Sequence, residues 1–261
     1  MHRFAAPLLA ALIVSGAAAC SNDKLATSPT AELAATSGLA NPDVSTFQIS
    51  SAGTDSAGSG PCTFDDTTGQ FSCPDVTRDG VTFTRTFAFF DASGNPQSKF
   101  DPATTASTKL DTSAKGTITG RNQTTTIDRT GEMITSGLAG AETSHTLNGT
   151  EQGTVVTVST GRDGTQTTVS TTIADSTNSL VVPVPSKDNH GGGPGGRFPL
   201  SGSQTHSTTT TTTHGSDTQT NSFSRTETFD GTSVVRVDIT KNGTTQHCTI
   251  DLEHGTNTCG M

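Results

Sequence analysis

The residues of this chain whose chemistry is clearest are its cysteines, Cys20, Cys62, Cys73, Cys248 and Cys259. Four of them bound two similar segments, Cys62–Cys73 and Cys248–Cys259. Each segment begins C-T-apolar-D, has a glycine at the same place, and ends in a small hydroxyl residue and a cysteine. A tight turn just before that glycine would bring the two cysteines of each segment opposite one another in a hairpin. Directly opposed residues of antiparallel strands come close enough to form a disulfide.

We therefore predict the disulfides Cys62–Cys73 and Cys248–Cys259. Four cysteines allow three connectivities, and the second-ranked one joins the two ends of the domain through Cys62–Cys259 and Cys73–Cys248. In the chain-entropy model each short closure contributes about 3 kcal/mol to stability.

The segment before Cys20 has the layout of an export signal. It has a cationic start, Met1-His2-Arg3, an apolar run over residues 4–14 and small residues up to Ala19, as in a secretory signal peptide. The apolar run is shorter than the ~20 residues that span a membrane. Because an unpaired thiol is a liability in an oxidising compartment, the fifth cysteine needs a role of its own.

The segment that ends in Cys20 resembles the lipobox of bacterial lipoproteins, with Ala17 where that family usually has leucine. The resemblance implies cleavage after Ala19, so that residues 1–19 are a signal peptide, and a lipid anchor on Cys20. Ser21, rather than Asp, follows Cys20, which in lipoproteins of Gram-negative bacteria implies the outer membrane rather than the inner membrane. The alternative is ordinary signal-peptidase cleavage after Ala17-Ala18-Ala19, which would release a secreted soluble β protein.

We find no motif for catalysis, a cofactor or a metal, and we expect a protein that is not an enzyme. His247 and His254 would face opposite sides of one strand, and His206 and His214 would lie ~27 Å apart along another. A zinc site within either pair is therefore geometrically poor. The stretch Asp91–Asn95 alternates like the start of a calcium loop, but its glycine is misplaced and a plain turn is favoured.

Composition narrows the classes of partner and fold. The net charge is -9 with only 15 Lys and Arg, which argues against a nucleic-acid partner. Hydrophobic residues make up 29% of the chain and there is no Trp or Tyr, so a large single core is not expected. Threonine, about one residue in five, is β-branched and favours strands. We predict an all-β fold: an antiparallel Thr-rich meander, open barrel or sandwich.

The chain divides into a flexible N-terminal tether and a β domain. Residues 20–60 are rich in Ser, Ala, Thr and Gly and are predicted to be the lipid-anchored tether. Residues 61–261 form the β domain, in which the Gly-rich stretch 190–196 is a candidate boundary between two halves.

Strand and turn patterns recur through the β domain. Residues 81–89 are the clearest strand, with Val81, Phe83, Phe87 and Phe89 on one face. Hairpin turns are predicted at four dipeptides: Asn148-Gly149, Asp163-Gly164, Asp230-Gly231 and Asn242-Gly243.

Two stretches are harder to assign. Prolines in Val181–Pro185 place it at a sheet edge or strand end. Ser203–His214 has no apolar face, so it is either an edge strand or one that packs through threonine methyl groups. A weaker similarity links Phe83-Thr84-Arg85-Thr86 with Phe223-Ser224-Arg225-Thr226, for which chance is the preferred explanation.

These features predict a lipid-anchored cell-envelope protein with a non-enzymatic structural or interaction role. The membrane would be reached through the anchor, and the sequence identifies neither a protein partner nor a small hydrophobic ligand for the β domain. One alternative is a carrier or chaperone of hydrophobic ligands, built like the open barrels of lipoprotein trafficking, a resemblance of architecture alone.

Overall fold

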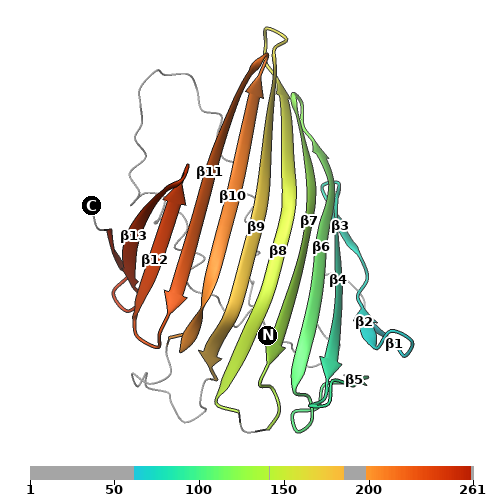
Figure 1. Ribbon diagram of the computed structural model, residues 1–261. Coiled ribbons are helices and arrows are strands. Elements are labelled where there is room, and N and C mark those ends of the chain that lie inside the picture. The colour runs from blue at the N-terminus through green and yellow to red at the C-terminus, as the bar shows by residue number, and fades with distance from the viewer. Residues whose placement is uncertain (1–61, 141, 185–197, 260–261) are drawn as a thin grey trace, which may run out of the picture.

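The computed structural model describes residues 62–140, 142–184 and 198–259, and all strands of this part of the chain belong to one antiparallel sheet (Figure 1). The strands are β1 (Thr63–Asp65), β2 (Gln70–Ser72), β3 (Val76–Arg78), β4 (Val81–Phe90), β5 (Pro96–Gln97), β6 (Ser107–Thr119), β7 (Gln123–Ser136), β8 (Ser144–Thr160), β9 (Gln166–Pro183), β10 (Ser201–His214), β11 (Asp217–Phe229), β12 (Val234–Lys241), β13 (Thr244–Asp251) and β14 (Thr256–Cys259). The predicted all-β meander is confirmed.

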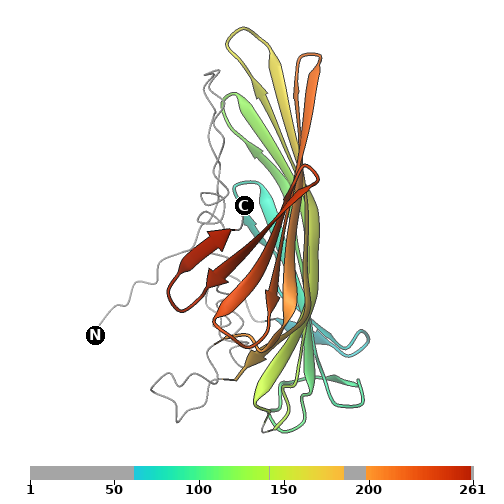
Figure 2. The same ribbon diagram turned by 60° about the vertical axis from the view of Figure 1, so that its left-hand side comes forward.

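The sheet is open and strongly curved. Its main path runs from β1 to β14 without a pairing that joins the two ends, while β3 and β5 pair with β4 beside the path. Figure 2 shows the curvature, with β12 and β13 turned in toward the hollow side. We call that side the concave face and the opposite side the outer face. Of the three predicted architectures, the described strands therefore form a meander in a single layer.

Several predicted features lie outside the described residues: the signal peptide 1–19, Cys20, the tether 20–60 and the Gly-rich stretch 190–196. The strands on either side of that stretch share the sheet, because β9 and β10 pair from Ser201↔Val181 to His214↔Thr167. A bulge interrupts this ladder between Ser201 and Ser203.

The two cysteine hairpins have the predicted form. The structure contains the disulfides Cys62–Cys73 and Cys248–Cys259, and Cys248 is directly opposite Cys259 in the ladder. The glycine of each turn has positive φ, 69° at Gly69 and 62° at Gly255. Each turn also begins with an aspartate whose side chain accepts backbone N–H bonds, as in Asp65 Oδ1 with Thr67 N at 2.8 Å. The predicted pairing of these four cysteines is confirmed.

Three of the four predicted dipeptide turns are present. Asp163-Gly164 connects β8 to β9, Asp230-Gly231 connects β11 to β12, and Asn242-Gly243 connects β12 to β13. Asn242 and Gly243 both have positive φ, 49° and 84°, as a two-residue type I′ hairpin requires.

The prediction of a turn at Asn148-Gly149 is wrong, because both residues lie inside β8. Asn148 Oδ1 instead accepts the N–H of Ser179 at 2.8 Å, next to an irregularity in the β8–β9 ladder. Gly149 is needed for space, since a Cβ there would lie 2.8 Å from the thioether sulfur of Met133. In this Asn-Gly pair, the asparagine therefore bonds to a ladder irregularity and the glycine allows a close contact, and no turn forms.

The Thr-rich strand β10 is an interior strand, which contradicts the edge-strand alternative. It pairs with β9 on one side and with β11 on the other. Its hydroxyl groups form cross-strand hydrogen bonds, among them Thr205–Thr226 at 3.1 Å and Thr211–Thr220 at 3.1 Å. Such cross-strand pairs fix the register of a strand that has no apolar face. Pro183 ends β9, as predicted for a strand end.

Buried side chains gather in two places on the concave face. Near the N-terminal edge, Phe89 is fully buried and its ring contacts those of Phe71, Phe87 and Phe100. Val81, Phe83, Phe87 and Phe89 share this face as predicted, but Phe83 is 44% exposed.

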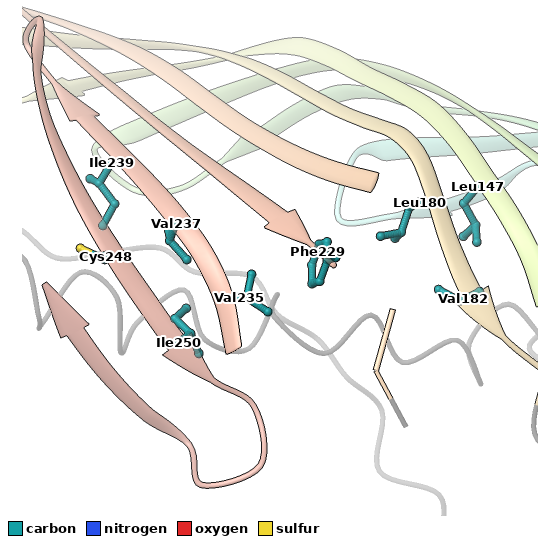
Figure 3. Close-up of a cluster of buried hydrophobic side chains, with 9 residues drawn as sticks. All are labelled: Leu147, Leu180, Val182, Phe229, Val235, Val237, Ile239, Cys248 and Ile250. Carbon is teal, nitrogen blue, oxygen red and sulfur yellow. The ribbon is translucent and has the colours of Figure 1, made fainter. Parts of the chain in front are cut away.

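The second group, the C-terminal cluster, joins β8 and β9 to the curled strands β11–β13 (Figure 3). It consists of Leu147, Leu180, Val182, Phe229, Val235, Val237, Ile239, Cys248 and Ile250. Because β12 and β13 turn inward, their apolar residues meet those of β8 and β9 across the concave side.

Candidate functional site on the concave face

The strand register sorts side chains between the two faces of the sheet. One row of directly opposed concave residues crosses it from β4 to β13: Arg85, Thr112, Gly131, Glu151, Asp175, His206, Arg225, Ile239 and Gln246. Directly opposed residues in a ladder point to the same side. The acids and bases of this row therefore all belong to the concave face.

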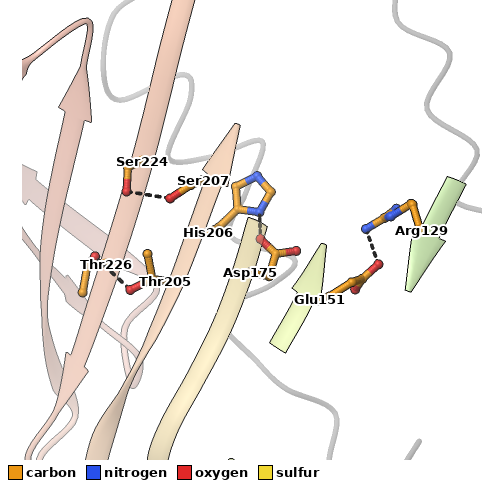
Figure 4. A network of polar contacts seen from close by, with 8 residues as sticks. All are labelled: Arg129, Glu151, Asp175, Thr205, His206, Ser207, Ser224 and Thr226. Carbon is orange, nitrogen blue, oxygen red and sulfur yellow. Dashed lines mark hydrogen bonds and ion pairs between the residues drawn. The ribbon is translucent and has the colours of Figure 1, made fainter. Parts of the chain in front are cut away.

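Six residues on the concave face of β7–β11 form a band that we call the belt: Arg129, Glu151, Asp175, His206, Arg225 and Glu227. Two of its contacts are drawn in Figure 4. Arg129 Nη2 lies 2.6 Å from Glu151 Oε1, and His206 Nδ1 lies 2.5 Å from Asp175 Oδ1. The hydroxyl pairs in the same view, Thr205–Thr226 and Ser207–Ser224, belong to the outer face.

The centre of the belt brings two carboxylates together. Glu151 and Asp175 are directly opposed on β8 and β9, an arrangement that is destabilising for like charges. Each acid has its own basic partner on the far side, Arg129 for Glu151 and His206 for Asp175. The attraction of each carboxylate to its basic partner offsets the repulsion between the two carboxylates.

The end of the belt nearest the C-terminal cluster is buried. Arg225 and Glu227 are 4% and 6% exposed and form an ion pair between Nη2 and Oε1. Burial raises the pKa of Glu227, and the attraction of Arg225 opposes that rise in part. Burying an ion pair of this kind carries a large desolvation cost, and removing one of its partners strongly lowers the stability of the fold.

Glycines leave room beside the belt. Gly131 lies in the row itself, Gly149 is opposite Met133, and Gly153 is opposite Arg129. A Cβ at Gly153 would come within 2.7 Å of Arg129 Cγ, so the arginine stem lies across this glycine. Gly in a strand interior often marks such a close approach.

A hollow of about 300 Å³ opens next to Gly131 and Gly149 on the concave face. Its lining includes Leu110, Met133, Gly149, Glu151, Asp175 and Thr177. Met133 also packs against the C-terminal cluster, which makes the hollow continuous with that apolar region. The site thus combines an apolar floor with charged groups along one side, as small-molecule sites commonly do.

The outer face is different. Its hollow, of about 350 Å³, is lined mainly by polar side chains, among them Thr84, Thr86, Asp111, Thr130 and Glu132. Ion pairs there are those of a solvated sheet, such as Lys109 with Glu132 at 2.7 Å. The hydrogen bond from Lys109 to Glu132 is the main reason that the pKa of Lys109 is raised.

The residues weighed for metal chemistry in the sequence do not come together. His247 and His254 each contact a different aspartate, Asp238 at 2.6 Å and Asp251 at 2.7 Å. The bond to Asp251 raises the pKa of His254 and lowers that of Asp251. Within residues 62–140, 142–184 and 198–259, no group of three or more His, Cys, Asp or Glu side chains is arranged to hold a metal ion.

The calcium-loop-like stretch Asp91–Asn95 forms a turn in the structure. Asp91 closes a plain turn, in which its carboxylate accepts the N–H groups of Ser93 and Asn95 and the Asn95 side-chain amide. These bonds, that of the Asn95 side chain first, lower the pKa of Asp91. In the part of the chain that the structure covers, no helix has the length and apolarity to cross a membrane.

The similarity between the two Phe-x-Arg-Thr stretches has a structural counterpart. Arg85 and Arg225 lie in the same row, near opposite ends of the sheet. Arg85 Nε donates to Cys73 Sγ at 3.4 Å and its Nη2 lies 3.9 Å from Cys62 Sγ, so Arg85 sits over the first disulfide. Arg85, which shares the face of the phenylalanines on β4, therefore has the disulfide sulfurs as its partners.

Sequence reasoning missed the belt and the hollow. Of the six belt residues, the sequence singled out only His206, in a search for zinc ligands, and Arg225, in a similarity put down to chance; the contacts Arg129–Glu151 and Asp175–His206 join different strands. One usable signal was present: glycines inside strand-like stretches, Gly131, Gly149 and Gly153, indicate close approach of other groups. No protein-family model, curated protein or solved structure matches the chain.

Proposed function

We propose that this is an exported, lipid-anchored protein of the cell envelope, more specifically of the outer membrane, that binds a hydrophobic ligand on the concave face of its sheet without catalysing a reaction. The lipobox-like segment before Cys20 supports the anchor. Two disulfides in the β domain support an oxidising compartment outside the cytosol.

The observation that carries the binding role is the one-sided distribution of apolar residues on an open sheet. Leu110, Met133 and Ile173 lie on the concave face and are only partly buried. Met133 extends the C-terminal cluster to a hollow of about 300 Å³. A partly exposed apolar surface rimmed by polar groups is typical of a binding surface.

The anchor is tested by metabolic labelling of the host with a radioactive or alkyne-bearing fatty acid. We expect the wild-type chain to carry the label and to fractionate with membranes, and the Cys20→Ala chain to lose both properties. The matched control is Ser21→Ala, a substitution at the next residue that leaves the cysteine in place. We expect Ser21→Ala to keep the label, so that loss of the label in Cys20→Ala reports the missing thiol rather than a general effect of mutating this segment. An unlabelled wild-type chain with a free thiol on its first residue would contradict the anchor.

Ligand binding is tested with the neutral fluorescent hydrophobe N-phenyl-1-naphthylamine and the Cys20→Ala chain, which needs no detergent. We expect saturable binding that weakens roughly five- to tenfold in Met133→Gln, because the probe loses apolar contact in the hollow. The matched control is Ile134→Gln, the next residue on β7, which faces outward and is 37% exposed.

Equal effects of the two substitutions would contradict binding on the concave face. An absence of probe binding, together with no lipid in mass spectra of the gently purified protein, would leave the sheet with a structural role alone.

A further inference from the structure

The two disulfides close similar hairpins but have different neighbours. In each hairpin one cysteine lies beside the adjoining strand of the sheet, Cys73 beside β4 and Cys248 beside β12. Cys73 N donates to Arg85 O at 3.1 Å, which continues the ladder between β2 and β4 and places Arg85 opposite Cys73. The residue opposite Cys248 is Val237. One disulfide therefore has a cation at the position where the other has an apolar side chain.

Arg85 contacts both sulfurs of the first disulfide. Its Nε lies 3.4 Å from Cys73 Sγ, and its Nη2 lies 3.9 Å from Cys62 Sγ. Both cysteines are partly exposed and Arg85 is exposed, so a dissolved reagent can reach this disulfide. A guanidinium is a permanent cation that donates hydrogen bonds and accepts none. It stabilises a sulfur that carries negative charge more than it stabilises a neutral disulfide.

The second disulfide is enclosed by apolar side chains. Cys248 is 5% exposed and belongs to the C-terminal cluster, and Cys259 packs against that cluster. Val237, opposite Cys248, is fully buried. Such surroundings disfavour a thiolate and restrict the approach of a reagent. The second disulfide thus has the properties of an inert crosslink.

We infer that Cys62–Cys73 is a site of thiol–disulfide exchange at which Arg85 stabilises the departing thiolate of Cys73, while Cys248–Cys259 is a structural crosslink. The reactant is a dithiol reductant. This reactivity goes beyond the proposed function, since it depends neither on the lipid anchor nor on a ligand of the concave face.

The exchange takes two steps. A thiolate of the dithiol attacks Cys62 Sγ, the S–S bond breaks, and its electron pair stays on Cys73 Sγ next to Arg85 Nε. Cys62 is the sulfur attacked because the better-stabilised thiolate is the better leaving group. The second thiol of the reagent loses its proton and attacks the reagent's own sulfur in the mixed disulfide, which releases Cys62 as a thiolate. The protein disulfide gains two electrons, and the dithiol becomes a cyclic disulfide as its two protons pass to water or to the protein thiolates.

The test follows each disulfide separately in the folded Cys20→Ala chain, whose remaining cysteines are the four of the two disulfides. After limited exposure to dithiothreitol and an acid quench, differential alkylation and peptide mass spectrometry give the reduced fraction of each pair. We expect Cys62–Cys73 to be reduced at least about tenfold faster than Cys248–Cys259. With the monothiol 2-mercaptoethanol, we expect the trapped mixed disulfide on Cys62 rather than on Cys73.

Arg85→Gln separates the effect of the cation from that of exposure, with the fold checked by circular dichroism. We expect it to slow the reduction of Cys62–Cys73 about three- to tenfold and to leave that of Cys248–Cys259 unchanged. A substitution that only loosened the hairpin would speed the reduction, so the sign of the change identifies its cause. Arg85→Lys, which keeps a cation, is expected to recover part of the rate. Arg78→Gln, which removes an exposed arginine from β3 at the same edge of the sheet, serves as the control and is expected to leave the rate unchanged.

Equal reduction rates at the two disulfides, or a 2-mercaptoethanol adduct chiefly on Cys73, would overturn the assignment. An Arg85→Gln chain that is reduced as fast as its parent, or faster, would do the same. So would an equal slowing in Arg78→Gln, which would point to the net charge of the edge instead of the contact with the sulfurs. None of these outcomes bears on the binding of the neutral probe, so the proposed function is tested independently.

Discussion

Replacing Arg225 with methionine is expected to lower the free energy of unfolding by about 3–5 kcal/mol. The substitution leaves the carboxylate of Glu227 buried without its cation, since Glu227 is 6% exposed and Arg225 is its ion-pair partner. Methionine fills similar volume, so the loss reports the stranded charge rather than a cavity. Urea unfolding followed by far-ultraviolet circular dichroism measures it, because the chain has no tryptophan.

Two further variants identify the cause of that loss. Arg225→Met with Glu227→Leu removes both charges and is expected to recover stability to within about 1 kcal/mol of the wild type. Arg236→Met, which removes an exposed arginine on the outer face of β12, is expected to cost at most about 1 kcal/mol. A loss in Arg225→Met no larger than that in Arg236→Met would refute the role assigned to the buried pair.

The Arg225–Glu227 pair also makes the stability of the fold depend on pH. Burial raises the pKa of Glu227 above its unfolded value, so the folded state binds this proton more tightly than the unfolded chain does. The stability from Glu227 is therefore fully present below its unfolded pKa and is lost as the pH rises through its folded pKa. Without Arg225 that pKa rises further, and the deficit of Arg225→Met is expected to shrink as the pH falls from about 7 to about 5.

Phe89→Ala is expected to cost about 3–5 kcal/mol, because it removes a fully buried ring at the centre of the N-terminal aromatic group. The ring of Phe89 lies 5.5 Å from that of Phe71 and 5.6 Å from that of Phe100. Hairpin β1–β2 meets β4 through only two paired positions, Phe71↔Phe87 and Ser72↔Thr86. We therefore expect the hairpin to lose protection from hydrogen exchange along with global stability.

Phe83→Ala is the matched control for that substitution. Phe83 lies on the same strand and the same face but is 44% exposed, so its loss is expected to cost less than about 1.5 kcal/mol. Denaturant midpoints of the two variants, measured side by side, check the difference. Similar losses at both positions would mean that the aromatic group does not hold the hairpin.

Features whose causes lie within a few residues could be predicted from the sequence. Local causes of this kind explain the two cysteine hairpins, Cys62–Cys73 and Cys248–Cys259. They also explain the Asn242-Gly243 turn and the alternation of residues 81–89. A glycine with positive φ, an aspartate that accepts neighbouring N–H groups and a period of two are local in origin. The all-β class followed in the same way, from β-branched residues between such turns.

The predictions were wrong or undecided where one sequence is compatible with two structures and contacts with a distant strand determine which of them forms. Asn148-Gly149 has the composition of a turn, but its partners are Ser179 on β9 and Met133 on β7. Ser203–His214 has no apolar face, and its interior position depends on hydroxyl partners on β9 and β11. Such partners cannot be identified before the pairing is known.

The belt depended wholly on the tertiary structure. Asp175 and His206 meet because β9 and β10 pair in one register, and Glu151 joins them through the register of β8. A slip of one residue would send each of these side chains to the opposite face of the sheet. The sequence alone determined the two cysteine hairpins, three of the four predicted dipeptide turns and the strand-forming character of the chain, because short-range sterics and hydrogen bonds fix them. Pairing between strands decided which side chains share the concave face, because that choice is made by contacts across the whole sheet.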